Sequence, residues 1–119
     1  MKPLFFLILI LLVSSNMNAQ FNELWHKTHN GKGDYSDVFT CMTTDDAGNV
    51  YAAGYSMEIG ENANFLMAKY NSSGTLLWHK TWNGSGNGPD QANAIQFANN
   101  RIYATGYVNS TIVGHDFFT

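Results

Sequence analysis

Cysteine and basic residues are scarce in this sequence, and each shortage excludes a class of protein. Cys41 is the single cysteine among 119 residues, so a disulfide within the chain is impossible. Lys and Arg number six against nine Asp and Glu, which gives a formal net charge of −3. With no basic stripe and no polybasic cluster, we expect no binding to nucleic acid and none to an anionic membrane surface.

Long apolar runs are also scarce, and the one that exists lies near the start. Residues 4–13 form an unbroken apolar run of ten, half of the about 20 that a membrane-spanning helix needs. Lys2 precedes the run, and small and polar residues up to Ala19 follow it. This plan predicts a secretory signal peptide at 1–19 and a secreted or cell-surface protein with no membrane attachment after cleavage. The remaining residues 20–119, without disulfides, must be held together by packing.

Helical periodicity is the third feature that the sequence lacks. No segment after residue 19 has an apolar i, i+3, i+4 stripe of useful length. Short runs rich in Val, Ile, Thr, Tyr, Phe and Trp alternate with clusters of Gly, Asn, Asp and Ser, which is typical of strands and turns. The turns at 45–49 and 71–74 offer Gly48 and Gly74 for positive φ. We therefore predict an all-β fold with strands at 21–28, 38–44, 49–56, 64–70, 75–82, 91–97, 101–108 and 116–119.

Many residues occur twice, in the same order, about 53 positions apart. The stretch LWHKT at 24–28 recurs at 77–81 with an offset of 53, and YAAGY at 51–55 recurs as YATGY at 103–107 with an offset of 52. The change in offset indicates one deleted residue in the turn that corresponds to 45–49. A period of this length is typical of propellers and solenoids. The other matched pairs are Asn30-Gly31 with Asn83-Gly84, Asp37 with Asp90, and Asn64-Phe65 with Asp116-Phe117.

Each matched unit is expected to hold four short strands joined by tight turns, which is the plan of a β-propeller blade. In 49–55 neither face is polar, as expected for a sheet that is covered on both sides. We therefore predict a partial β-propeller of about 1.9 antiparallel four-stranded units. It has an outer strand at 21–28, a complete blade at 38–82 and an incomplete blade at 91–119. Because propellers use about four to eight blades, we expect a fragment of a longer protein that can self-associate through open blade faces.

Three stretches resemble a known family: DDAGNVYAAGYS at 45–56, NFLMAKYNSSGTLLWHKTWNG at 64–84 and NRIYATGY at 100–107. They are similar to the bacterial β-propeller repeat called the SBBP repeat, and the likeness runs from about Phe21 to the last residue. The resemblance implies a secreted or surface-exposed bacterial scaffold and no catalytic centre. It also makes each LWHKT the outermost strand of a blade, the first copy being without inner strands of its own. From the central axis outward, the implied strand order is 38–44, 49–56, 64–70, 75–82.

The histidines are the first candidates for metal ligands. His26 and His79 occupy equivalent positions on the outer strands of different blades. That places them too far apart to share one ion at about 2 Å. His29 and His115 are single loop histidines, so we expect no metal site at any of the four.

Three loop aspartates, Asp34, Asp37 and Asp90, lie among glycines in the loops 29–37 and 83–90. Calcium takes about six to eight oxygen ligands and can use such loops, but no spacing here matches a complete calcium loop. The alternative is that the last aspartate of each loop caps the strand that follows. The plainer interpretation is a flexible connection with this capping role, and calcium binding is the alternative.

The sequence contains no arrangement that predicts catalysis. A serine nucleophile needs an elbow, a base and an oxyanion hole, and these residues do not supply them. Cys41 aligns with Ala94 in a strand of small residues, which predicts a packed side chain rather than a nucleophile. We expect a non-enzymatic structural or binding scaffold with no catalytic, cofactor-binding or metal-binding residues and no cofactor, whose partner is an unknown extracellular protein or carbohydrate. The alternative is part of a secreted propeller enzyme, a hydrolase or lyase, whose active site lies outside these residues.

Overall fold

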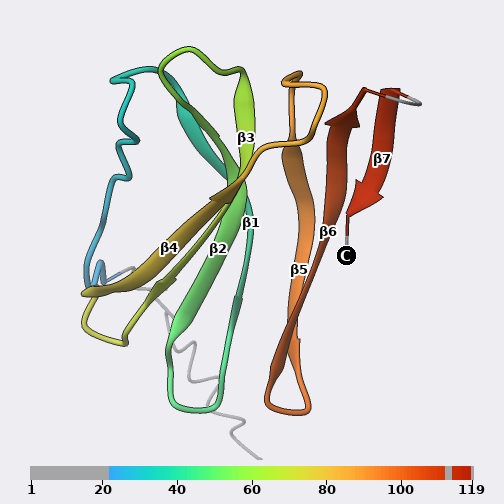
Figure 1. The fold of residues 1–119 in the computed structure, drawn as a ribbon. Coiled ribbons are helices and arrows are strands. Elements are labelled where there is room, and N and C mark those ends of the chain that lie inside the picture. Colours follow the sequence, from blue (N-terminus) through green and yellow to red (C-terminus); the bar gives the residue numbers. More distant parts are fainter. Residues whose placement is uncertain (1–21, 112–113, 119) are drawn as a thin grey trace, which may run out of the picture.

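The computed structural model describes residues 22–111 and 114–118, and every regular element in those ranges is a strand. The strands form two antiparallel sheets: sheet A has the order β1-β2-β3-β4 and sheet B the order β5-β6-β7 (Figure 1). The all-β prediction is therefore confirmed. In the described part, no helix is long and apolar enough to span a membrane. The strands are β1 Asp37–Thr44, β2 Val50–Met57, β3 Ala63–Tyr70, β4 Leu76–Trp82, β5 Gln91–Ala98, β6 Arg101–Ser110 and β7 Gly114–Phe118.

Seven of the eight predicted strands are present, with bounds that differ from the prediction by at most two residues. The largest differences are at the end of β6, which continues to Ser110, and at the start of β7, which begins at Gly114. The prediction of a strand at 21–28 is wrong, because residues 22–28 form no strand. Phe21 and the predicted signal peptide at 1–19 lie outside the described residues.

The hairpin turns have the backbone geometry that their residues favour. Gly48 and Gly74 both have a φ of 78°, as expected for glycines that supply the left-handed conformation. In the β5–β6 turn, Asn99 and Asn100 have φ values of 51° and 59°, which is the pattern of a tight type I′ turn. Five residues separate the paired Thr44 and Val50, and four separate the equivalent pair Phe97 and Ile102, which is the one-residue difference in the sequence offset.

Both sheets carry the same irregularity between their first two strands. The register shifts between Phe39 and Cys41 in sheet A, and between Ala92 and Ala94 in sheet B, 53 positions later. A glycine lies opposite each shift. A Cβ at Gly54 would collide with the backbone of Val38 and Phe39, and one at Gly106 would collide with Gln91 and Ala92. The bulge and the glycine therefore belong together, because the close approach of the two backbones leaves no space for a side chain.

The core lies between the two sheets. The inner face of sheet A contacts the near face of sheet B, with Phe65 and Ala53 fully buried at its centre. Tyr51 stacks on Phe97 across the two sheets with ring centroids 5.9 Å apart, and Phe65 meets Trp82 edge to face at 5.7 Å. The inner face of sheet A consists of Tyr51, Ala53, Phe65, Met67, Trp78 and Trp82, and the near face of sheet B of Ala92, Ile95, Phe97, Ile102 and Ala104.

The other side of sheet A, its outer face, is partly covered by residues 22–36, the N-terminal segment (Figure 1). Leu66 and Ala68 are fully buried there. The sequence predicted an open face, whereas this face is partly covered. The segment contacts the sheet through side chains, since Trp25 packs on Tyr70 and His29 on Phe39. A strand needs a backbone ladder, and a segment that lies on a face has no sheet edge to pair with. The outer face consists of Phe39, Met42, Val50, Ala52, Leu66, Ala68 and Tyr70.

The close approach at the bulge makes a prediction about Gly54. We expect Gly54→Ala to reduce the free energy of unfolding by about 3 kcal/mol, because the new methyl group must displace backbone rather than a flexible side chain. Gly60→Ala is the control. Gly60 has a φ of 76° and no atom within 4 Å of an added Cβ, so it should cost only the about 1 kcal/mol of a left-handed alanine. Urea denaturation of the two variants measures both; equal losses would contradict the steric explanation.

Candidate binding surface

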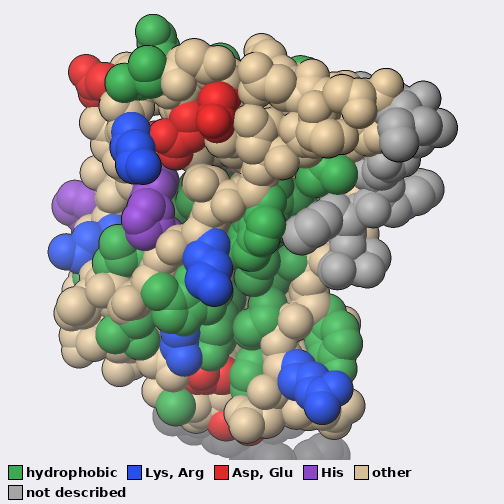
Figure 2. Space-filling model, in the orientation of Figure 1, with side chains coloured by type: hydrophobic (Ala, Val, Ile, Leu, Met, Phe, Trp, Pro, Cys, Tyr) green, Lys and Arg blue, Asp and Glu red, His purple; other side chains and the backbone are tan. Residues whose placement is uncertain are grey.

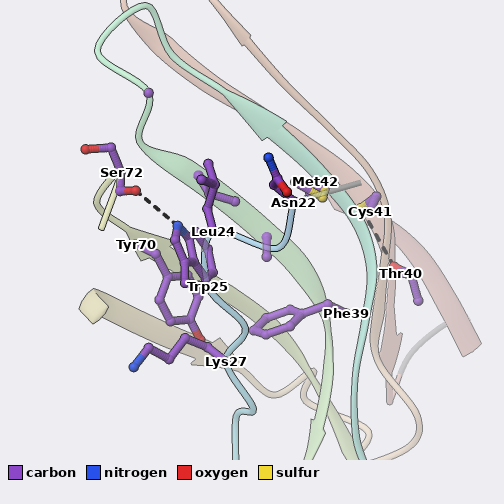
Figure 3. Close-up of a pocket in the computed structure, with 13 residues that line it drawn as sticks. Asn22, Leu24, Trp25, Lys27, Phe39, Thr40, Cys41, Met42, Tyr70 and Ser72 are labelled. Atoms are coloured by element: carbon purple, nitrogen blue, oxygen red, sulfur yellow. Dashed lines mark hydrogen bonds between the residues drawn. The ribbon is translucent and has the colours of Figure 1, made fainter. Parts of the chain in front are cut away.

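A cavity of about 820 Å³ lies between the N-terminal segment and the outer face of sheet A (Figure 3). Its floor is formed by side chains of β1 and β2, and its wall by Leu24, Trp25 and Tyr70. Among the described residues that line it, Lys27 carries the one full charge at neutral pH, and none is a carboxylate or an imidazole. Such a lining suits an apolar or aromatic ligand surface. The lining residues are Asn22, Leu24, Trp25, Lys27, Phe39, Thr40, Cys41, Met42, Gly48, Val50, Ala52, Tyr70 and Ser72.

Trp25 fixes the N-terminal segment over the cavity. Its indole Nε1 donates a hydrogen bond of 3.0 Å to the carbonyl oxygen of Ser72 in the β3–β4 turn (Figure 3). The indole lies against Gly74, where any Cβ would press on the ring. Its centroid is 6.0 Å from that of Tyr70, which in turn meets Phe39 edge to face at 6.4 Å. Burial raises the pKa of Tyr70, so its phenol stays neutral within this aromatic wall.

His29 contacts His79, a pairing that sequence analysis missed. Their ring centroids are 5.0 Å apart, and His29 also lies 5.8 Å from Phe39. Burial lowers the pKa of His29, and His79 lowers it further, while Asp37 and Glu58 act in the opposite direction. Figure 2 shows histidine side chains beside lysines on the side of the molecule where β4 and the N-terminal segment lie in Figure 1.

His26 does not join this pair. His26 is exposed, and its Nδ1 lies 2.6 Å from Glu23 Oε1. His115 belongs to β7, and its side chain is outside the described part of the structure. Within residues 22–111 and the backbone of 114–118, no three His, Cys, Asp or Glu side chains group in a way that could hold a metal ion.

Asp37 and Asp90 make the same pair of hydrogen bonds in the two sheets. Asp37 accepts from the backbone amides of Gly31 at 2.5 Å and Met57 at 3.2 Å. Asp90 accepts from Gly84 at 2.6 Å and Asn109 at 2.5 Å. Each carboxylate thus ties the loop before its sheet to the end of the second strand. This geometry agrees with the strand-capping interpretation of the sequence.

Asp34 and Cys41, the two other candidates from the sequence, make only ordinary contacts with neighbouring residues. Asp34 is exposed, and its Oδ1 accepts a hydrogen bond of 2.9 Å from Asn30 Nδ2. Cys41 is half-buried and packs against the core, with its Sγ 3.7 Å from the carbonyl oxygen of Ala53. The neighbouring Thr40 donates from Oγ1 to the carbonyl oxygen of Ala92 at 2.6 Å and so links the two sheets.

The floor of the cavity is the part that sequence reasoning did not locate. Phe39, Met42 and Val50 are apolar residues on one face of neighbouring strands, and this alternation is readable in the sequence. That they line a cavity depends on the path of the N-terminal segment, which local sequence does not determine.

The buried carboxylate of Asp90 yields a stability prediction. Asp90→Ala should lower the free energy of unfolding by about 3 kcal/mol, since it removes a buried carboxylate and leaves two part-buried amide groups without their acceptor. Asp90→Asn keeps the shape and one acceptor oxygen and should lose less. The exposed Asp34→Ala, at a residue with a φ of 51°, should cost only the about 1 kcal/mol of a left-handed alanine. Chemical denaturation tests the order; a loss for Asp34→Ala as large as that for Asp90→Ala would refute it.

The lowered pKa of His29 yields a pH prediction. An ordinary histidine has a pKa of about 6.5, and the folded value is lower, so the unfolded chain takes up this proton first as the pH falls. The contribution of His29 to stability is therefore complete above about pH 6.5 and is lost as the pH falls from there through the folded pKa. Thermal melts at pH 7.5 and pH 5 should show a smaller acid loss for His29→Gln than for the wild type. Asn30→Gln, in the same segment, should retain the wild-type dependence; an unchanged dependence in His29→Gln would disprove the assignment.

No protein-family model, no curated protein sequence and no solved structure matches this chain. What the chain does must therefore be inferred from its own residues. The two features that bear on function are the apolar cavity on the outer face of sheet A and the paired aspartate clamps that position both sheets.

Proposed function

We propose that the chain is a secreted, non-enzymatic scaffold built from β-propeller-type units of the SBBP kind. The observation that carries the proposal is the recurrence of one structural unit at the offsets of the sequence matches. The bulge, the glycine opposite it and the aspartate clamp occur in both sheets, 52 or 53 positions apart. A unit that is copied together with its supporting contacts is typical of a repeat array, whose surface rather than one catalytic centre performs the function.

The stacking of the sheets supports the same proposal. Sheet B packs face to face on sheet A, and the near face of sheet B carries the positions that correspond to the outer face of sheet A. Each unit therefore buries one face against a neighbour of its own kind. This arrangement is the way in which blades and other repeats share a core.

The use of the acidic residues supports a binding role over a catalytic one. Asp90 and Asp37 accept hydrogen bonds from backbone amides, which holds loops in place. The described lining of the cavity offers apolar and aromatic side chains but no carboxylate or imidazole to act as a general base. We infer that the cavity binds rather than transforms its ligand.

Export and activity can be tested together by expressing the full coding sequence in a bacterial host. We expect the culture medium to contain a product that begins at Gln20, as measured by mass spectrometry. Ala19→Arg is the matched control, because a large charged residue at the cleavage point should leave the uncleaved precursor in the cell. A membrane-bound wild-type product that retains Met1 would contradict the secreted part of the proposal.

The exported product should show only background turnover with polysaccharide and peptide substrates of hydrolases and lyases. A turnover signal that disappears in Asp34→Ala, Asp37→Ala or Asp90→Ala, each shown to be folded by circular dichroism, would favour the enzyme alternative instead. A signal that persists in all three would point to a contaminating host activity.

A further inference from the structure

We propose that the chain binds a second copy of itself head to tail. The far face of sheet B in one copy would occupy the cavity on the outer face of sheet A in the next. The far face of sheet B is the side turned away from sheet A and includes Ala94, Gln96, Tyr103 and Thr105, which are all exposed. The inference goes beyond the proposed function and does not depend on it, because a scaffold can bind an unrelated ligand as a monomer.

The contact between sheets A and B within one chain is the template. On the side of sheet A, Tyr51 stacks on Phe97 of sheet B with the ring planes 14° apart. A hydrogen bond of 2.6 Å from Thr40 Oγ1 to the carbonyl oxygen of Ala92 adds a polar link at the edge of the same interface. The inner face of one unit and the near face of the next are therefore complementary surfaces.

The first half of this interface recurs, uncovered, on sheet B. Tyr103 and Thr105 correspond to Tyr51 and Ala53 of the inner face, 52 positions earlier. Tyr51 is 6% exposed beneath sheet B, whereas 51% of Tyr103 is exposed. Tyr103 is thus exposed on sheet B, although the equivalent Tyr51 of sheet A is buried.

The second half recurs, also uncovered in part, on sheet A. Four residues of the near face of sheet B have counterparts on the floor of the cavity: Ala92 with Phe39, Ile95 with Met42, Ile102 with Val50, and Ala104 with Ala52. All four counterparts are apolar, yet Met42 is 64% exposed. Sheet A packs on the near face of sheet B, and the cavity lies at the equivalent place on sheet A. A preceding sheet would therefore pack over the cavity.

The N-terminal segment shows which kind of occupant fits. Trp25 corresponds to Trp78 of β4, and Trp78 packs against the core cluster beside Tyr51 on the inner face of sheet A. Trp25 lies against the outer face of sheet A. The segment thus takes the place of a fourth strand in a preceding sheet, and no described residues form the first three strands of such a sheet on this face.

A second copy supplies what is missing. Sheet B has three strands within the described residues, and β7 forms one of its edges. Docked on the outer face of sheet A, it would bring the edge of β7 toward the N-terminal segment of its neighbour. An edge strand such as β7 can form backbone hydrogen bonds with the N-terminal segment of the neighbouring copy. This pairing would explain why the LWHKT stretch of that segment matches β4, whereas binding of an unrelated ligand would not.

The test is the association state of the exported product of the full coding sequence, measured by analytical ultracentrifugation over a range of concentrations. We expect the wild type to assemble as its concentration rises. Tyr103→Glu and Met42→Glu should each be monomeric, because each places a charge in one of the two surfaces. Ile59→Glu, at a residue that is 70% exposed but outside both surfaces, should assemble as the wild type does.

Mixing the two monomeric variants provides the decisive arm. A Tyr103→Glu copy retains an intact cavity, and a Met42→Glu copy retains an intact far face, so an equimolar mixture should form dimers and stop there. A wild type that stays monomeric up to about 1 mM, or a mixture that stays monomeric, would overturn the proposal. Equal disruption by Ile59→Glu would overturn it as well, since it would indicate non-specific association.

A gain of affinity checks the register of the contact. Thr44 is exposed on β1 and corresponds to Phe97, the partner of Tyr51. Thr44→Phe should stack on Tyr103 of the docked copy and tighten association by about threefold to tenfold, the range of an aromatic pair. The gain should vanish when Tyr103→Ala is added. No gain, or a gain that survives Tyr103→Ala, would refute the proposed register.

Discussion

The hydrogen bonds of Asp90 hold the two sheets in their relative positions. Its backbone amide donates to the carbonyl oxygen of Ala63 in β3 at 2.6 Å, while its carboxylate accepts from Gly84 in the connecting loop and Asn109 in β6. One fully buried residue therefore joins sheet A, the loop and sheet B. The aromatic contact of Tyr51 with Phe97 adds packing between the same two sheets. In a low-dielectric interior such a charged acceptor is strong when satisfied and costly when lost.

The positions of the strands were predictable because local chemistry determines them. Glycine or asparagine at positive φ marks the hairpins, and runs of β-branched and aromatic residues mark the strands between them. The paired aspartates were visible as a match at an offset of 53, although the choice between calcium ligand and cap needed the backbone amides that they bind. Periodicity reveals which side chains share a face of a sheet. It does not reveal what covers that face, so the contact of His29 with His79 and the cavity beneath Trp25 were not predictable.

The two copies of LWHKT show why identical residues do not ensure identical structure. At 77–81 the stretch lies within β4, which pairs with β3 along its length. At 24–28 it forms no strand and contacts the sheet through Trp25. Strand formation depends on a partner more than on intrinsic preference, so a segment without a ladder uses its side chains instead. The same tryptophan packs on an apolar sheet face in both settings, which is the property that the two copies share.

The single thiol of the chain also has a practical consequence. Cys41 is half-buried against the core between the two sheets, and no other cysteine competes with it for a reagent. The rate at which a thiol is alkylated depends on access to its sulfur as well as on its ionisation. Because the Cys41 side chain packs against the core between the two sheets, a change in how the sheets contact each other should alter the labelling rate of this one atom. The unmodified protein thus carries a single site for a thiol reagent, and the rate at which that site is labelled reports on the packing of the two sheets.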